Sequence, residues 1–234
     1  MCSSDLEQPG GQRDDRGALM GVARHAIWYF DVISPFAYLQ LKQFQRLPAD
    51  LGIEYVPVLF AGLLKAHGHK GPAEIAEKRR QTYRMCVWLA RERGIEFRFP
   101  PAHPFNPLHV LRLLIGAGAS AANVAVVLEC IWRDGNDVND AGTFADLATR
   151  LGVTDGAGLI ARPEVKQQLI ANTERAVARG IYGVPTFDFN GELFWGGDCI
   201  GMMNAFAKDP ALFASGEYAR VDALPAAAER RPAR

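Results

Sequence analysis

The sequence lacks an excess of charge of either sign, with 26 lysines and arginines against 26 aspartates and glutamates in 234 residues. A domain that binds nucleic acid usually carries a basic excess, so the composition argues against that class. Long apolar runs are also missing, and none approaches the roughly 20 residues that a membrane-spanning helix needs. The hydrophobic content of 49% is that of an ordinary globular protein. We therefore expect neither a nucleic-acid nor a membrane partner.

Cysteine is scarce, and its spacing excludes the common redox and metal motifs. No C-x-x-C pair and no histidine at ligand spacing accompanies any of the four cysteines, Cys2, Cys86, Cys130 and Cys199. We expect free thiols in a reducing, cytoplasmic compartment and no metal site. Cys86 and Cys130 lie in apolar, helix-like stretches and are expected in the core. A chemical role for Cys199 stays open, because a reactive thiol needs an accessible, electropositive setting.

The two ends of the chain lack the hydrophobic periodicity of folded elements. Residues 1–20 are polar and glycine-rich, without the apolar segment of a signal peptide. We predict a disordered leader over residues 1–24. Residues 216–234 combine proline, spaced alanines and paired arginines, and we predict a flexible tail there.

Strand-like patterns occur only towards the two ends of the remaining chain. Ala26–Asp31 and Ile53–Val58 are rich in aromatic and β-branched residues, and Pro57 places the second segment at a sheet edge. Thr186–Phe189 and Glu192–Trp195 form another pair, joined by an Asn-Gly dipeptide that is a strong signal of a type I′ hairpin. We therefore expect one small sheet built from both ends of the chain.

Helical patterns fill the rest of the sequence. A first helix begins after Ser34, with proline at its first position, and runs to about Leu47. Further helices are predicted over 73–94, 108–117, 123–134, 143–151 (capped by Thr143) and 163–180, with a proline-rich loop at 99–107. Asp198 is expected to cap a last helix near Cys199–Ala207.

The resulting order is β-α-β, a block of helices, then β-β-α. This order is typical of an α/β protein with a thioredoxin-like fold and a large all-helical insertion. We predict a thioredoxin-like domain formed by residues 25–60 and 181–215, and a helical insertion domain formed by residues 61–180.

Ser34 stands where the first strand ends and the first helix begins. Unpaired backbone N–H groups and the positive end of a helix dipole converge at such a turn. The hydroxyl can therefore cap the helix, or it can hold a thiolate that a ligand brings in. Val184-Pro185 precedes a later strand and is expected opposite this helix. In thioredoxin-like folds, the residue before a cis proline at that place presents its backbone to a peptide ligand.

Five motifs follow one another along the chain: FDVISPFAYL (30–39), LKAHGHKGPAE (64–74), FPPAHPFNPL (99–108), GVPTF (183–187) and WGGD (195–198). Together they resemble the 2-hydroxychromene-2-carboxylate isomerases, which are DsbA-like members of the thioredoxin superfamily and are related to kappa-class glutathione transferases. The resemblance covers roughly residues 25–210, and the order and spacing of the motifs make it specific.

The resemblance implies that glutathione is the cofactor. Ser34-Pro35-Phe36-Ala37 stands in place of the C-x-x-C tetrad of disulfide oxidoreductases, so dithiol exchange has no cysteine to use there. In the family, the serine matching Ser34 hydrogen-bonds the glutathione sulfur, which favours the thiolate. The other glutathione contacts implied by the resemblance are made by Val184, Pro185, Trp195, Gly196, Gly197 and Asp198, with Asp198 at the γ-glutamyl ammonium group.

The resemblance also implies a reaction and a substrate. The glutathione thiolate adds to a conjugated carbon of 2-hydroxychromene-2-carboxylate or a related aromatic unsaturated acid. The adduct then rotates about the former double bond, and expulsion of glutathione gives the trans-hydroxybenzylidenepyruvate. Lys65 would pair with a carboxylate of substrate or glutathione, and His69, Phe105 and Asn106 would lie at the substrate. A homodimer is implied as well.

The chain departs from the family pattern in ways that leave alternatives open. It has His67-Gly68-His69 where the family often has Thr-Gly-Asn, and Phe105 near a position where a tyrosine can occur, so the substrate is less constrained than glutathione. His67 and His69 lack a third metal ligand. Asp31 is either a catalytic acid or a turn residue at a strand end. A kappa-type glutathione transferase and a non-catalytic module for a thiol or peptide are the competing functions.

Overall fold

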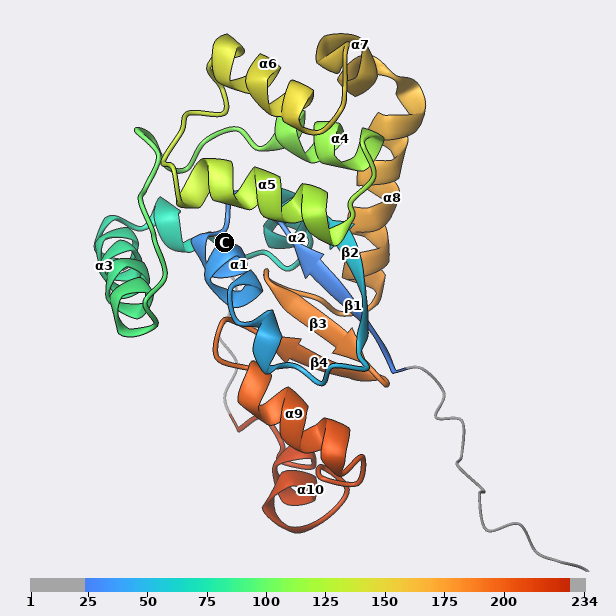
Figure 1. Ribbon diagram of the computed structural model, residues 1–234. Coiled ribbons are helices and arrows are strands. Elements are labelled where there is room, and N and C mark those ends of the chain that lie inside the picture. Colours follow the sequence, from blue (N-terminus) through green and yellow to red (C-terminus); the bar gives the residue numbers. More distant parts are fainter. Residues whose placement is uncertain (1–23, 228–234) are drawn as a thin grey trace, which may run out of the picture.

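The computed structural model describes residues 24–227, so Cys2 and the predicted leader lie outside the described residues, apart from Arg24. A four-stranded mixed sheet runs through the molecule in the order β2-β1-β3-β4 (Figure 1). The central strand β1 (His25–Phe30) pairs in parallel with β2 (Gly52–Pro57) and antiparallel with β3 (Thr186–Phe189). An antiparallel partner of β3, β4 (Glu192–Trp195), closes the other edge. The predicted strands are confirmed, and the proline-containing β2 lies at an edge.

The turn between β3 and β4 has the backbone that its sequence predicts. Asn190 has a φ of 49° and Gly191 a φ of 88°. A type I′ turn requires positive φ at both central positions, which asparagine and glycine tolerate best. The tight turn sets the register of the hairpin, in which Trp195 lies opposite Thr186. Thr186 is the first residue of β3, so Trp195 lies next to the loop that precedes β3.

The two faces of the sheet bury different clusters, because side chains alternate along each strand. Trp28, Phe30 and Phe187 are fully buried in the larger core cluster. Tyr29 and Val56 point to the opposite face, where α2 (Phe60–Ala66) and α8 (Pro163–Ala178) contribute Leu63 and Ala176 to a smaller cluster. The sheet is therefore covered on both faces.

Between β2 and β3 the described chain contains helices and loops only. The helices between α2 and α8 are α3 (Ala76–Glu92), α4 (Leu108–Gly116), α5 (Ala121–Trp132), α6 (Ala141–Arg150) and α7 (Gly156–Ala161). In Figure 1, α4 to α7 lie above the sheet and α3 stands to the left of α1 (Pro35–Leu41). The thioredoxin-like fold with a helical insertion is thus confirmed, while the division into two domains stays a prediction. Within residues 24–227, no helix is both long and apolar enough to cross a membrane.

The first helix is shorter than its apolar pattern indicates, and the expected end at Leu47 is wrong. α1 ends at Leu41, and a separate 3-10 turn covers Phe44–Arg46. The Gln43 side chain donates to the carbonyl of Leu39 at 2.9 Å, and the Gln43 backbone N–H bonds Gln40. The backbone bond is an i→i−3 bond of the 3-10 type, and the side chain occupies the Leu39 carbonyl that the Gln43 N–H would bond in an α-helix, so the α-helical repeat stops here. Likewise, the predicted helix 73–94 divides into a 3-10 turn at Pro72–Glu74 and α3.

Two expected helix caps are also wrong. α6 begins at Ala141 because the carboxylate of Asp140, one turn before Thr143, accepts the Thr143 backbone N–H at 2.8 Å. Asp198 does not cap the last predicted helix, since α9 (Ile200–Lys208) follows Cys199 without a side-chain capping bond.

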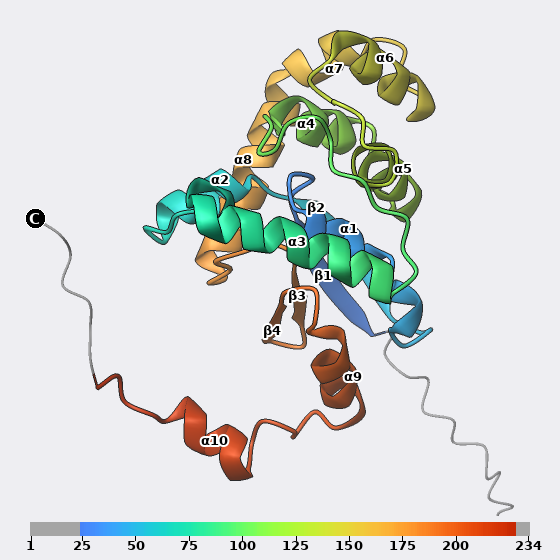
Figure 2. The ribbon, with the colours of Figure 1, turned by 90° about the vertical axis from the view of Figure 1, so that its left-hand side faces the viewer.

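Part of the predicted flexible tail is helical. α10 (Gly216–Asp222) follows α9, and the ring of Tyr218 lies 5.2 Å from that of Phe213. Figure 2 shows α10 set away from the sheet. Aromatic packing on Phe213 therefore orders a segment whose composition alone indicates flexibility. Residues 228–234 of the predicted tail lie outside the described residues.

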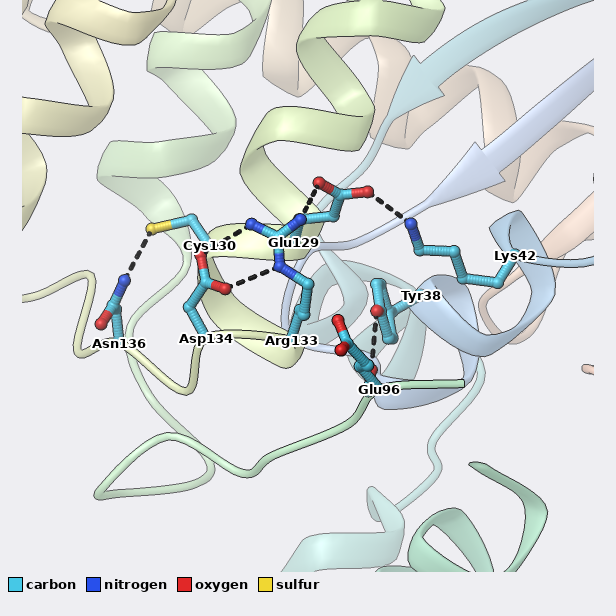
Figure 3. Close-up of polar contacts among 8 residues, drawn as sticks. All are labelled: Tyr38, Lys42, Glu96, Glu129, Cys130, Arg133, Asp134 and Asn136. Carbon is cyan, nitrogen blue, oxygen red and sulfur yellow. Dashed lines mark hydrogen bonds and ion pairs between the residues drawn. The ribbon is translucent and has the colours of Figure 1, made fainter. Parts of the chain in front are cut away.

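A polar cluster holds α1 against α5 (Figure 3). Lys42, directly after α1, forms an ion pair with Glu129 of α5, and Arg133 donates to the same carboxylate at 2.6 Å. On α1 itself, the hydroxyl of Tyr38 donates to the carbonyl of Glu96 at 2.8 Å. These contacts fix the orientation of α1, and with it the turn that precedes the helix.

Candidate active site

A cavity of about 540 Å³ opens at the carboxyl end of β1. Its walls come from the turn into α1, from α2 and α3, and from loops before α4 and before β3. Cavities of this volume are typical of small-molecule sites. Five of the residues predicted for the site line it: Ser34, His69, Phe105, Val184 and Trp195.

The hydroxyl of Ser34 faces the cavity rather than the helix. Ser34 is 8% exposed and occupies the N-cap position of α1, yet its side chain makes no capping hydrogen bond. Its Oγ donates instead to the carbonyl of Val184, at a long 3.5 Å. A weak bond of this length leaves the hydroxyl available to a ligand. Pro35 occupies the first helical position, as predicted.

The loop before β3 forms the wall opposite Ser34. The Val184–Pro185 peptide bond is cis, and the Pro185 carbonyl accepts the backbone N–H of Gly196 at 2.9 Å. A Cβ at Gly183 would lie 2.6 Å from Nε1 of Trp195, so only glycine permits this close approach. Trp195 is 52% exposed and contributes its ring to the rim of the cavity.

Asp31 lies at the base of the cavity and is fully buried. Its carboxylate accepts the backbone N–H of Ile33 at 3.0 Å and that of Phe60, at the start of α2, at 2.8 Å. Burial raises the pKa of Asp31 from 3.8 to about 7, and the two N–H donors oppose that rise. Asp31 therefore organises the turn at the strand end, and its carboxyl titrates near neutral pH.

Tyr83 and His103 form a second polar pair on the cavity wall, which the sequence did not single out. Nδ1 of His103 lies 2.6 Å from the hydroxyl of Tyr83, on α3, and Nε2 lies 2.9 Å from the carbonyl of Ile33. Burial lowers the pKa of His103 below its ordinary 6.5. A signal was present, because His103 lies within the FPPAHPFNPL motif, but nothing in the sequence marks Tyr83 as its partner.

Positive charge reaches the rim from lysines other than the predicted one. Lys70 and Lys78 line the cavity, whereas Lys65 is exposed on α2 outside the lining. His69 lies on the rim with its ring 6.0 Å from that of His67. Glu74 lines the cavity together with these two lysines, so the charged side chains there sum to a net positive charge, which suits a carboxylate ligand.

The remaining predicted contacts lie beside the cavity rather than in its lining. Pro185, Gly196 and Gly197 are chain neighbours of the lining residues Val184 and Trp195 but do not line the cavity themselves. Asp198 is exposed, and its charge acts on the neighbouring guanidinium of Arg93. The side chain of Asn106 accepts the Leu108 backbone N–H at 3.1 Å and so closes the start of α4. Their ligand contacts stay predictions.

The cysteines within residues 24–227 are buried free thiols. Sγ of Cys199 lies 3.3 Å from the carbonyl of Phe194 and 3.2 Å from the side-chain nitrogen of Gln40. Burial raises the pKa of Cys199 to about 12, so it is protonated at neutral pH. We assign it a packing role.

Known proteins resemble this chain over most of its length. A family model described as "DSBA-like thioredoxin domain" matches residues 27–206. A 2-hydroxychromene-2-carboxylate isomerase of Pseudomonas putida is 28% identical over 186 residues, covering 76% of this chain and 91% of that protein. Glutathione S-transferase kappa 2 of Caenorhabditis elegans is 26% identical over 174 residues, covering 68% of this chain and 77% of that protein.

A solved structure of 2-hydroxychromene-2-carboxylate isomerase shares the fold. Its TM-score is 0.72 at 24% identity, covering 81% of this chain and 98% of that one. The resemblance inferred from the motifs is thereby confirmed, as is the expectation of an enzyme of the isomerase class. Because the family match spans most of its length, the chain belongs to the DSBA-like thioredoxin domain family.

Proposed function

We propose that this protein is a glutathione-dependent isomerase of 2-hydroxychromene-2-carboxylate or a related aromatic unsaturated acid. One observation carries the proposal: the buried hydroxyl of Ser34 makes no capping bond and lines a cavity beside Val184. No cysteine occupies positions 34–37, so a thiol used there must come from a ligand. The relatives named as isomerases and as kappa glutathione transferases support glutathione as that ligand.

The proposed role of Ser34 is to stabilise the thiolate of glutathione. α1 has only seven residues, so its dipole alone is a weak source of positive potential. A hydroxyl that donates to sulfur favours the anion directly, because it stabilises charge that the thiol lacks. Free thiols titrate at a pKa of about 8.5, so even a modest lowering increases the thiolate fraction at neutral pH.

Glutathione would then lie across Ser34 and Val184, whose hydroxyl and carbonyl oxygens are 3.5 Å apart. The backbone of Val184, next to cis Pro185, is proposed to bond the cysteinyl part of the tripeptide. Trp195 would cover it at the rim, and Asp198 with Gly196 and Gly197 would meet its γ-glutamyl end. The substrate would occupy the part of the cavity near Phe105 and His69, with Lys70 or Lys78 at its carboxylate.

A kappa-type glutathione transferase is the second candidate, and the kappa relatives favour it. Both enzymes add the thiolate to an electrophilic carbon, but a transferase keeps the adduct whereas an isomerase expels glutathione. We also propose that the protein is cytoplasmic, because a reducing compartment keeps glutathione and the buried cysteines as thiols. The homodimer that the family resemblance implies is part of the same proposal.

The test has two parts. Calorimetry with glutathione should give saturable binding at one site per chain, and the isomerisation of 2-hydroxychromene-2-carboxylate, followed by absorbance, should require catalytic glutathione. Conjugation of 1-chloro-2,4-dinitrobenzene should be slower than isomerisation. Conjugation without isomerisation would favour the transferase, and binding without either activity would leave a thiol-binding module.

A further inference from the structure

The cavity contains one polar pair that the proposed glutathione contacts do not use. Tyr83 projects from α3 and His103 from the loop before α4, and both line the cavity with Ser34. The Tyr83 hydroxyl lies 2.6 Å from Nδ1 of His103 and 2.7 Å from the His103 carbonyl. Nε2 lies 2.9 Å from the carbonyl of Ile33, the residue before Ser34.

These contacts fix the protonation state of His103. A carbonyl oxygen can only accept, so the nitrogen that faces Ile33, Nε2, carries the proton. Burial disfavours the imidazolium, so Nδ1 of the neutral ring bears a lone pair. The Tyr83 hydroxyl is the group within reach of that lone pair. The single phenol proton has two acceptors within reach, Nδ1 of His103 at 2.6 Å and the His103 carbonyl at 2.7 Å, and of these the ring nitrogen is the base.

The proposed substrate needs such a pair. In a 2-hydroxychromene-2-carboxylate, carbon 2 is a tetrahedral hemiketal, so the ring double bond is not conjugated to a carbonyl. A thiolate adds readily only after the ring opens to the α-keto acid. Opening removes a proton from the hemiketal hydroxyl and delivers one to the former ring oxygen, and the Ser34 hydroxyl is engaged with sulfur at that time.

We propose that Tyr83, backed by His103, is the proton-transfer group of this ring opening, an inference that rests on the proposed function. The hemiketal O–H proton passes to Tyr83 Oη as the Tyr83 proton passes to Nδ1 of His103. The carbon–oxygen double bond forms at carbon 2, and the ring C–O bond breaks with its electron pair on the former ring oxygen of the substrate. That substrate oxygen then takes a proton from the Tyr83 hydroxyl, and Tyr83 takes a proton back from Nδ1 of His103. No net proton, electron or co-reactant is consumed.

The experiment compares three variants with the wild type. Tyr83→Phe removes the relay hydroxyl and keeps the ring. His103→Gln keeps a donor for the Ile33 carbonyl and an acceptor for Tyr83, but it has no basic nitrogen. Tyr55→Phe, a half-buried phenol of β2 outside the cavity, is the matched control. The readouts are kcat with 2-hydroxychromene-2-carboxylate and the Kd for glutathione.

We expect kcat to fall at least tenfold in Tyr83→Phe and in His103→Gln, with the Kd for glutathione within twofold of wild type in both. Tyr55→Phe should keep wild-type kcat. Full activity of His103→Gln would show that the histidine only positions Tyr83, and full activity of Tyr83→Phe would overturn the relay. A wild type that binds glutathione but does not isomerise this acid would also overturn the relay. A wild type that binds no glutathione would overturn the proposed function itself.

A second measurement tests the pair without turnover. Nitrogen-15 shifts of His103 in the wild-type protein should report a neutral ring protonated at Nε2, from pH 7 upward. An imidazolium, or a ring protonated at Nδ1, would leave no lone pair for Tyr83 and would contradict the proposal.

Discussion

At the scale of single residues, Ser34 differs from a capping serine in a way that experiment can separate. Ser120 also precedes a helix, and its hydroxyl accepts the Asn123 backbone N–H at 3.2 Å. Ser34 makes no such bond. Two serines at the same N-cap position therefore make different contacts, and the residue type alone does not predict which.

Ser34→Ala should lower turnover at least tenfold, equivalent to about 1.4 kcal/mol of activation barrier. Its free energy of unfolding should change little, because the hydroxyl makes only a long contact. Ser120→Ala is the control: it should lose about 1 kcal/mol of stability with its cap and keep its turnover. Steady-state kinetics and urea unfolding of both variants measure this. Equal kinetics in wild type and Ser34→Ala would remove the role assigned to Ser34.

The raised pKa of Asp31 should make the free energy of unfolding depend on pH. Its pKa is raised on folding from 3.8 to about 7, so between these values the folded chain holds a proton that the unfolded chain has released. Stability therefore falls as pH rises through this window, by up to about 4 kcal/mol. Below the window both states are protonated and Asp31 adds no slope.

The check is urea unfolding of wild type and Asp31→Asn at several pH values between 4 and 8. The variant should show a flatter dependence on pH, although it also loses one backbone contact because an amide nitrogen cannot accept from Ile33 or Phe60. A wild-type slope unchanged by the substitution would refute the assignment of this titration to Asp31.

At the scale of elements, the strands and the hairpin are predictable because their signals are local. The aromatic and β-branched residues of Ala26–Asp31 and the Asn190-Gly191 dipeptide each act through their immediate neighbours in the sequence. The ends of helices are less predictable. The end of α1 depends on the side chain of Gln43, and the start of α9 depends on a loop that Gln40 holds from a distant helix.

The residues of the candidate site likewise differ in whether the sequence predicts them. Ser34 and Val184 could be found from motifs, and the structure brings them to one cavity. The Tyr83–His103 pair could not be found, because its partners are 20 residues apart and no short motif joins them. The motif position predicts Lys65 as a carboxylate partner, but Lys65 is exposed on α2 outside the cavity lining, whereas Lys70, beyond the end of α2, lines the cavity.

Gln40 is the link between α1 and the loop that carries the WGGD motif. It is fully buried, accepts from Nε1 of Trp28 at 2.6 Å and donates to the carbonyl of Gly196 at 2.6 Å. Gln40→Leu leaves the buried indole N–H of Trp28 and the partly buried carbonyl of Gly196 without this partner, so the free energy of unfolding should fall by about 3 kcal/mol. The control Gln167→Leu, exposed on α8, should stay within about 0.5 kcal/mol. Chemical unfolding distinguishes them, and equal stability of the two variants would contradict this role.

At the scale of the whole molecule, the insertion and the sheet share one core. The larger cluster includes Trp28 and Phe187 of the sheet together with Leu111 and Leu128 of the helices. Trp132 of α5 also donates its indole N–H to the carbonyl of Val32 at 2.9 Å. A continuous core of this kind couples the two parts energetically.

We therefore expect residues 61–180 to unfold together with the sheet in one transition. Urea unfolding followed by far-ultraviolet and near-ultraviolet circular dichroism should give coincident curves. Two separated transitions would mean that the insertion is an independent folding unit.

The central claim is that Ser34 holds the sulfur of glutathione as a thiolate, and a pH titration of the bound cofactor tests it most directly. The thiolate absorbance of bound glutathione is measured by difference against the free protein, in which Cys86 and Cys199 stay protonated because burial raises the pKa of each to about 12. We predict a pKa for the bound thiol clearly below the ordinary value of about 8.5 in wild type, and a return towards that value in Ser34→Ala. Equal pKa values in the two proteins, or no binding of glutathione by the wild type, would contradict it.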